Sequence, residues 1–167
     1  MSETAQQYID RIVSNVGSDD PWQVLASSPR RLRELVHGRS EAELSRQPAP
    51  GRWSARAILA HLADCEVVMA WRLRSILAVN GVPLQPFDQN RWAEAFKYES
   101  TPVADSLDLL EANRRANLRL LRSADPASLE YFGMHAERGK ESITHLVRLN
   151  AGHDLNHIRQ IERLLAK

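Results

Sequence analysis

Apolar side chains recur every three or four residues over much of the chain, which is the spacing of amphipathic helices. The clearest such segment begins after Ser54, a predicted N-cap, and ends at Gly81. Its apolar positions are Ile58, Leu62, Cys65, Met69, Leu73 and Ile76. The pattern predicts one long helix that turns this face toward a core.

The same signals predict three more helices, over residues 29–38, 102–124 and about 143–165. Asp20-Pro21 and Ser28-Pro29 each have the form of an N-cap followed by proline at the first helical position. The second of these pairs is expected to open the helix that stops near Gly38.

Shorter elements are expected between and before these helices. Residues 3–16 have the pattern of a short amphipathic helix, residues 40–43 have capping-box spacing, and the loop-rich stretch 81–102 contains a helical piece around 91–96. Alternating runs rich in β-branched and aromatic residues, which would predict strands, are missing. We expect an all-α, four-helix bundle with short extra helices, forming one domain over residues 1–167. In it, residues 1–20 form an extension helix packed on the bundle.

Composition narrows the function classes. The 167 residues carry 22 basic and 21 acidic side chains, a net charge of +1, so no charged surface for nucleic acid is expected. No apolar run approaches the ~18 residues of a membrane span, and no signal peptide is evident. With a single cysteine, Cys65, no intramolecular disulfide can form. A cytoplasmic protein is the default expectation.

Candidate chemistry comes from the histidines. His153 and His157 are four residues apart in the last predicted helix, so their side chains lie within about 40° of each other around its axis. Two such imidazoles can bind one ion, although the same pair often has no role beyond a helix surface. His61 lies in the apolar central segment, where its ring nitrogens need partners. Asp64 or a backbone carbonyl could meet that need; a metal ion shared with a facing helix also would.

Two stretches also resemble a known family: WSARAILAHLADCE near the middle and LNAGHDLNHIRQIERLL at the C-terminus are similar to the DinB/YfiT-like superfamily. The segments FDQNRWA and MHAERGKES extend the likeness over most of the chain. The resemblance implies a four-helix bundle and a metal-binding histidine triad. By position, the triad falls on His61, His153 and His157.

Three neutral imidazoles would leave a divalent ion with an open coordination position, as in catalytic rather than structural sites. Zinc or nickel suits such ligands best, with iron and manganese as alternatives. The resemblance implies a metal-dependent enzyme that acts on a small molecule. It would use a low-molecular-weight thiol, as S-transferases do, or metal-activated water, as hydrolases do. The alternative is a non-catalytic stress-response protein that binds a metal or small ligand.

Four residues are candidates for secondary roles. Asp64 is expected to orient His61, and Gln160 to hydrogen-bond near the site. Cys65 is interpreted as a small core residue, with a fourth ligand or a reactive thiol as alternatives. His135 is expected in a solvated loop, or else at the mouth of the metal pocket. Apolar residues beyond those needed for one core stripe predict a homodimer.

Overall fold

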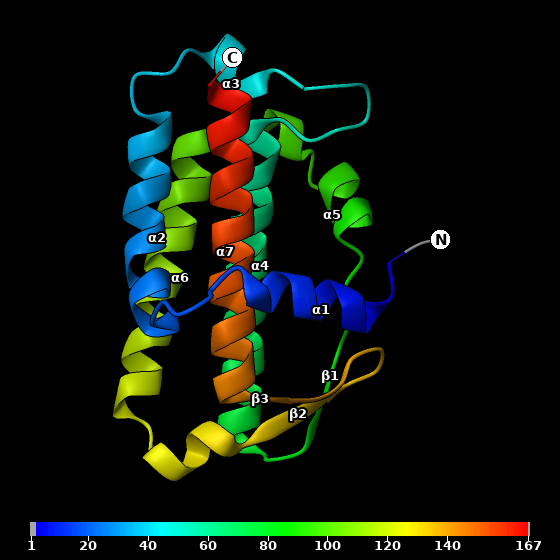
Figure 1. Cartoon of the computed structure of the whole chain (residues 1–167), viewed down its shortest axis with the longest axis vertical. Coiled ribbons are helices and arrows are strands. Elements are labelled where there is room, and N and C mark those ends of the chain that lie inside the picture. The colour runs from blue at the N-terminus through cyan, green and yellow to red at the C-terminus, as the bar shows by residue number, and fades with distance from the viewer. Residues whose placement is uncertain (1–2, 167) are drawn as a thin grey trace.

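The computed structural model describes residues 3–166, and four long helices dominate it (Figure 1). They are α2 (Pro21–Val36), α4 (Ala55–Ala78), α6 (Val103–Ser123) and α7 (Ile143–Leu165). Helix α4 packs on α6 and α7, and α2 packs on the same two helices, which closes the bundle. The prediction of a four-helix bundle is therefore confirmed. No described helix has the length and apolar character needed to cross a membrane.

Shorter elements cover the bundle: α1 (Ala5–Ser14), α3 (Glu41–Ser45), α5 (Gln89–Ala95), and two 3₁₀ segments, η1 (Tyr98–Ser100) and η2 (Pro126–Glu130). The extension helix α1 lies across α7 (Figure 1). Gly152 of α7 permits this crossing, because a Cβ there would lie 2.1 Å from the carbonyl oxygen of Ile12. Helix α1 therefore packs closely on α7 at Gly152, the residue that precedes His153.

The expectation that the chain contains no strands is wrong. β1 (Val82–Leu84), β2 (Phe132–His135) and β3 (Gly139–Ser142) form a small sheet at one end of the bundle. β1 pairs with β2 in parallel, and β2 with β3 in antiparallel. The strands are too short to show an alternating pattern, and their pairing joins segments about fifty residues apart in the chain. Tertiary contacts, rather than local sequence, therefore determine that these segments form strands.

Ser28-Pro29 does not begin a helix, because α2 already starts at Pro21 and continues through Pro29. Proline has no N–H to donate, so it leaves the carbonyl of Leu25, four residues earlier, without its usual helical partner. Arg114 of α6 supplies the missing donor, with Nη1 2.9 Å from that oxygen. A side chain from another helix thus lets α2 pass through a proline.

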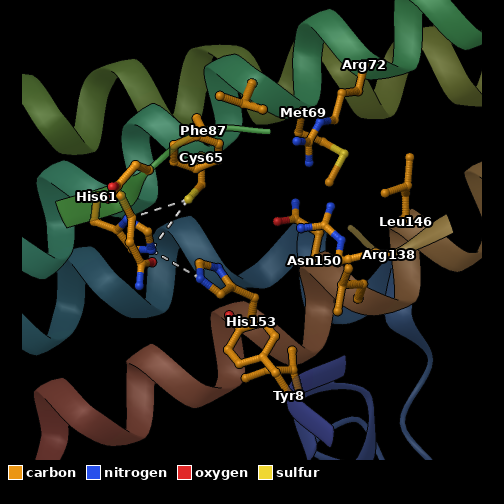
Figure 2. Close-up of a pocket in the computed structure, with 15 residues that line it drawn as sticks. Tyr8, His61, Cys65, Met69, Arg72, Phe87, Arg138, Leu146, Asn150 and His153 are labelled. Carbon is orange, nitrogen blue, oxygen red and sulfur yellow. Dashed lines mark hydrogen bonds between the residues drawn. The ribbon is translucent and has the colours of Figure 1, made fainter. Parts of the chain in front are cut away.

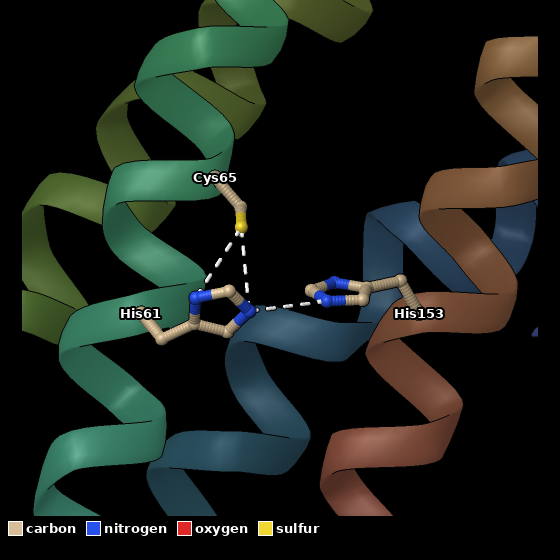
Figure 3. Close-up of side chains that lie close together, drawn as sticks. All are labelled: His61, Cys65 and His153. Atoms are coloured by element: carbon tan, nitrogen blue, oxygen red, sulfur yellow. Dashed lines mark hydrogen bonds between the residues drawn. The ribbon is translucent and has the colours of Figure 1, made fainter. Parts of the chain in front are cut away.

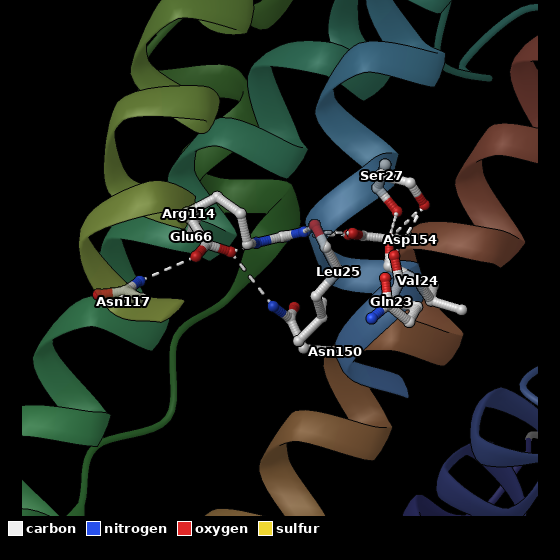
Figure 4. Close-up of polar contacts among 10 residues, drawn as sticks. Gln23, Val24, Leu25, Ser27, Glu66, Arg114, Asn117, Asn150 and Asp154 are labelled. Atoms are coloured by element: carbon white, nitrogen blue, oxygen red, sulfur yellow. Dashed lines mark hydrogen bonds and ion pairs between the residues drawn. The ribbon is translucent and has the colours of Figure 1, made fainter. Parts of the chain in front are cut away.

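Arg114 belongs to a buried polar layer in the bundle, and Figure 4 shows the residues that it contacts. Its guanidinium forms ion pairs with Glu66 of α4 at 2.8 Å and with Asp154 of α7 at 2.7 Å. Asn117 and Asn150 donate to the Glu66 carboxylate at 2.8 and 3.2 Å. Along α4, α6 and α7, this layer lies between two hydrophobic clusters, one toward each end of the bundle. Each of these charges is paired in this alignment of the helices, so the layer favours this register over a shifted one.

Candidate metal centre

Three imidazoles from two helices meet beside the polar layer. His61 extends from α4, and His153 and His157 from successive turns of α7. The Nε2 atom of His153 lies 3.2 Å from that of His61 and 3.1 Å from that of His157. Figure 3 shows His61 and His153 facing each other across the gap between their helices.

This spacing fits a shared ion better than mutual hydrogen bonds. The single Nε2 of His153 contacts two other Nε2 atoms, and one N–H can donate to only one of them well. By contrast, two nitrogens at 2.0–2.1 Å from a tetrahedral zinc ion are about 3.3–3.4 Å apart. The observed separations therefore lie within a few tenths of an ångström of a tetrahedral edge.

Burial keeps the imidazoles neutral. It lowers the pKa of His153 to about 4, with a smaller contribution from the positive charge of Arg114. Burial and the neighbouring His153 lower the pKa of His157 to about 3. Burial, followed by the other two histidines, holds the pKa of His61 well below its ordinary value. Neutral imidazole is the form that binds a metal, so no proton has to leave near pH 7.

Gln160 contacts His157 on the side away from the other two histidines. Its Oε1 atom lies 3.0 Å from Nδ1 of His157. When Nδ1–H donates to this oxygen, Nε2 is the unprotonated nitrogen, and it is the one that faces the other two histidines. Sequence reasoning did not assign a role to Trp53 here, but its ring packs on His61 with centroids 4.9 Å apart.

Asp64 does not orient His61. Its carboxylate points to another side of α4, where it accepts a hydrogen bond of 2.6 Å from the hydroxyl of Tyr98. The expectation fails because the hydroxyl of Tyr98 lies within hydrogen-bond distance on that side of α4 and engages the carboxylate.

Cys65 faces the histidines, which corrects its interpretation as a core residue. Its Sγ atom lies 3.5 Å from Nε2 of His61, and it is half-buried, outside the described hydrophobic clusters. With His61 and His153 it offers ligand atoms within 4.8 Å of one another. Burial, and then the nearby Asp64, raise the pKa of the thiol, so it stays protonated unless a cation is close.

His135 is also not where it was expected. It lies in β2, almost fully buried, and its Nδ1 accepts a hydrogen bond from the backbone N–H of Glu137 at 3.2 Å. Burial lowers its pKa, as does the charge of Arg138. It does not line the pocket beside the histidines. The error follows from the missed strand, because a histidine in a solvated loop and one in a paired strand look alike in sequence.

A pocket of about 370 Å³ opens next to two of the three histidines, His61 and His153 (Figure 2). His61, Cys65 and His153 lie at one end of it, and apolar side chains form much of its wall. The apolar residues are Ile12, Val68, Met69, Phe87, Leu146 and Leu149. Two arginines, Arg72 and Arg138, line the other end, and sequence reasoning missed both. Arg72 had a signal: it follows Cys65 by seven residues and so shares its helix face.

The protein is thus a four-helix bundle in which histidines from two facing helices, α4 and α7, lie close together. The sequence model of the DinB superfamily matches residues 25–161. The chain therefore belongs to the DinB superfamily, as its motifs predicted.

Several curated relatives are similar over most of their length. A protein of Oceanobacillus iheyensis named "putative metal-dependent hydrolase" is 28% identical over 93% of this chain and 90% of its own. Bacillus subtilis YfiT, also named "putative metal-dependent hydrolase", is 27% identical over 87% of this chain and 83% of its own. The solved YfiT structure, described as "a probable metal-dependent hydrolase with an unusual four-helix bundle topology", superposes with a TM-score of 0.80. It covers 98% of this chain and 88% of its own at 22% identity, so it supports the fold.

Proposed function

We propose that the chain binds one divalent metal ion through His61, His153 and His157 and is a metal-dependent hydrolase of a small molecule. The observation that carries the proposal is that Nε2 of His153 lies 3.1–3.2 Å from Nε2 of both His157 and His61, beside an open pocket that His61 and His153 line. The names of the curated relatives agree with this class of activity. Zinc or nickel is the preferred ion for three imidazoles.

The residues of the site have distinct roles in this proposal. The three histidines hold the ion without cancelling its charge, because all three are neutral. A divalent ion in such a site supplies Lewis acidity, which makes water nucleophilic near neutral pH. Gln160 keeps Nε2 of His157 free to bind, and Trp53 fixes the ring of His61 by packing. The apolar wall excludes bulk water and positions the substrate next to the ion.

Transfer of a low-molecular-weight thiol is the second candidate. A sulfur atom of the chain, Cys65 Sγ, already lies 3.5 Å from His61 Nε2, so the space beside the histidines accommodates sulfur. A thiol would bind in the same open position as its thiolate. A pocket that opens onto the histidines supports catalysis over simple metal storage, for which a closed site would suffice.

Elemental analysis of protein purified without an affinity tag tests the metal. We expect close to one equivalent per chain in the wild type and in Cys65→Ala, and a loss of most of it in His61→Ala and in His153→Ala/His157→Ala. Cys65→Ala keeps its metal because the three histidines already form the ligand set of an open site. His145→Ala, on the same helix but outside the cluster, is the matched control.

Full metal content in the double histidine variant would refute the ligand assignment. A metal-free Cys65→Ala protein would show instead that the thiol is a ligand. The metal-loaded protein is then assayed against a panel of esters and amides, and in parallel with thiols against an electrophilic dye. Turnover of the first panel without added thiol favours the hydrolase, and strictly thiol-dependent turnover favours the transferase.

A further inference from the structure

The charge of Arg72 is the least compensated buried charge in the pocket. Arg72 is 6% exposed, and its Nε atom has no hydrogen-bond partner among the residues that the structure describes. Within residues 3–166, its one hydrogen bond runs from Nη2 to the carbonyl oxygen of Gln85, 2.9 Å away. No carboxylate of the described chain forms an ion pair with it. A buried cation in this state is costly and calls for an anion.

Arg138 differs from Arg72 because it already has its counter-charge. From the turn between β2 and β3, its Nε and Nη2 atoms bind both carboxylate oxygens of Glu141, at 2.7 and 3.0 Å. Burial lowers the pKa of Arg72, as does the positive charge of Arg138 nearby, and the Glu141 carboxylate partly offsets both effects. Two guanidinium groups and one paired carboxylate leave this end of the pocket with a net positive charge.

Helix periodicity places this charge in line with the histidines. His61, Cys65, Met69 and Arg72 occupy one face of α4, at steps of four, four and three residues. Eleven residues along a helix correspond to about 16 Å between the Cα atoms of His61 and Arg72. The pocket thus has a cluster of imidazoles at one end, an apolar middle and an unpaired arginine at the other (Figure 2).

We infer that Arg72, flanked by Arg138, is the binding site for an oxyanion carried by the substrate, either a carboxylate or a phosphoryl group. The molecule recognised would be an organic anion with an apolar body, whose reactive group is turned toward the histidines. This inference depends on the proposed function only in treating the bound molecule as the substrate. The anion site itself depends on the arginines and the pocket alone.

Calorimetric titration with benzoate, phenylphosphonate and the neutral benzamide tests the inference. We expect one or both anions to bind the wild type and benzamide to bind much more weakly; the stronger anion identifies the oxyanion. In Arg72→Met, the affinity for that anion should fall about 30-fold or more, because a buried charge partner is lost. Arg30→Met is the control, since this arginine is exposed on α2 and lies outside the pocket.

A second variant, Arg72→Lys, and a titration repeated after metal chelation distinguish the remaining explanations. Arg72→Lys retains the charge but not the planar guanidinium, so it should fold and still bind the anion at least several-fold more weakly. Unchanged affinity in either Arg72 variant would overturn the inference. So would anion binding that survives in Arg72→Met but disappears when the metal is chelated, because the anion would then be a metal ligand. If the protein carries no metal, the proposed function fails, whereas the loss of anion binding in Arg72→Met remains measurable.

Discussion

Arg114→Met removes the one cation from the buried polar layer and should be severely destabilising. Arg114, Glu66 and Asp154 have side chains that are 3%, 1% and 2% exposed, so the two carboxylates would stay buried without a counter-charge. Breaking a buried ion pair by removing one partner costs about 3–5 kcal/mol. The carbonyl of Leu25, freed by Pro29, would lose its donor as well, at about 1–3 kcal/mol.

We therefore expect the free energy of unfolding to fall by about 4 kcal/mol or more at pH 7. For a domain of this size, that corresponds to a decrease in Tm of about 10 °C or more. The measurement is urea denaturation followed by circular dichroism, with Arg115→Met, its exposed neighbour on α6, as the control. The triple variant Arg114→Met/Glu66→Gln/Asp154→Asn should recover a large part of the loss, because it also removes the unpaired charges.

The deficit should also depend on pH in a defined direction. Burial raises the pKa of Asp154, and Arg114 partly offsets this, so the variant should have a still higher pKa at this carboxyl. A folded-state pKa above the unfolded one favours the folded state at low pH and loses that advantage as pH rises through it. The deficit relative to wild type should therefore be smaller at pH 5 than at pH 7. A loss below about 2 kcal/mol, independent of pH and not rescued in the triple variant, would refute this account of the layer.

Two further predictions concern the histidines and the assembly. In metal-free protein, His153 and His157 have pKa values of about 4 and 3, so below about pH 6.5 the unfolded chain takes up protons that the folded one does not. Stability should fall by about 2 kcal/mol per histidine from pH 7 to pH 5, and a flat profile in urea titrations would contradict this. Trp71 is 72% exposed on α4, next to Val67 at 42%. We predict that they form the homodimer contact, so Trp71→Ser should sediment as an 18.9 kDa monomer, whereas Val79→Ser should remain dimeric.

The sequence alone was sufficient for three of the four long helices and for nominating the candidate ligands. Helical periodicity and capping residues identify α4, α6 and α7 to within a few residues, because these signals are local. The spacing of His153 and His157 specifies a shared helix face for the same reason. The apolar segment around His61 marked that residue as a further candidate, and the family motifs then grouped it with the pair.

Tertiary structure decided the features that depend on distant partners. In the sequence, Pro29 indicates the start of a helix. The structure shows that the helix instead continues through Pro29, because Arg114 donates a hydrogen bond to the carbonyl of Leu25, 89 residues earlier in the chain. The strands exist because β1 meets β2, and that pairing buries His135. In the sequence, Arg72 looks like any arginine of a helix. Its burial in a pocket, with no ion-pair partner among the described residues, results from the packing of α1, α4, α7 and the β2–β3 turn around it. Local sequence determines which face a side chain occupies, whereas charge compensation and burial depend on what the fold places against that face.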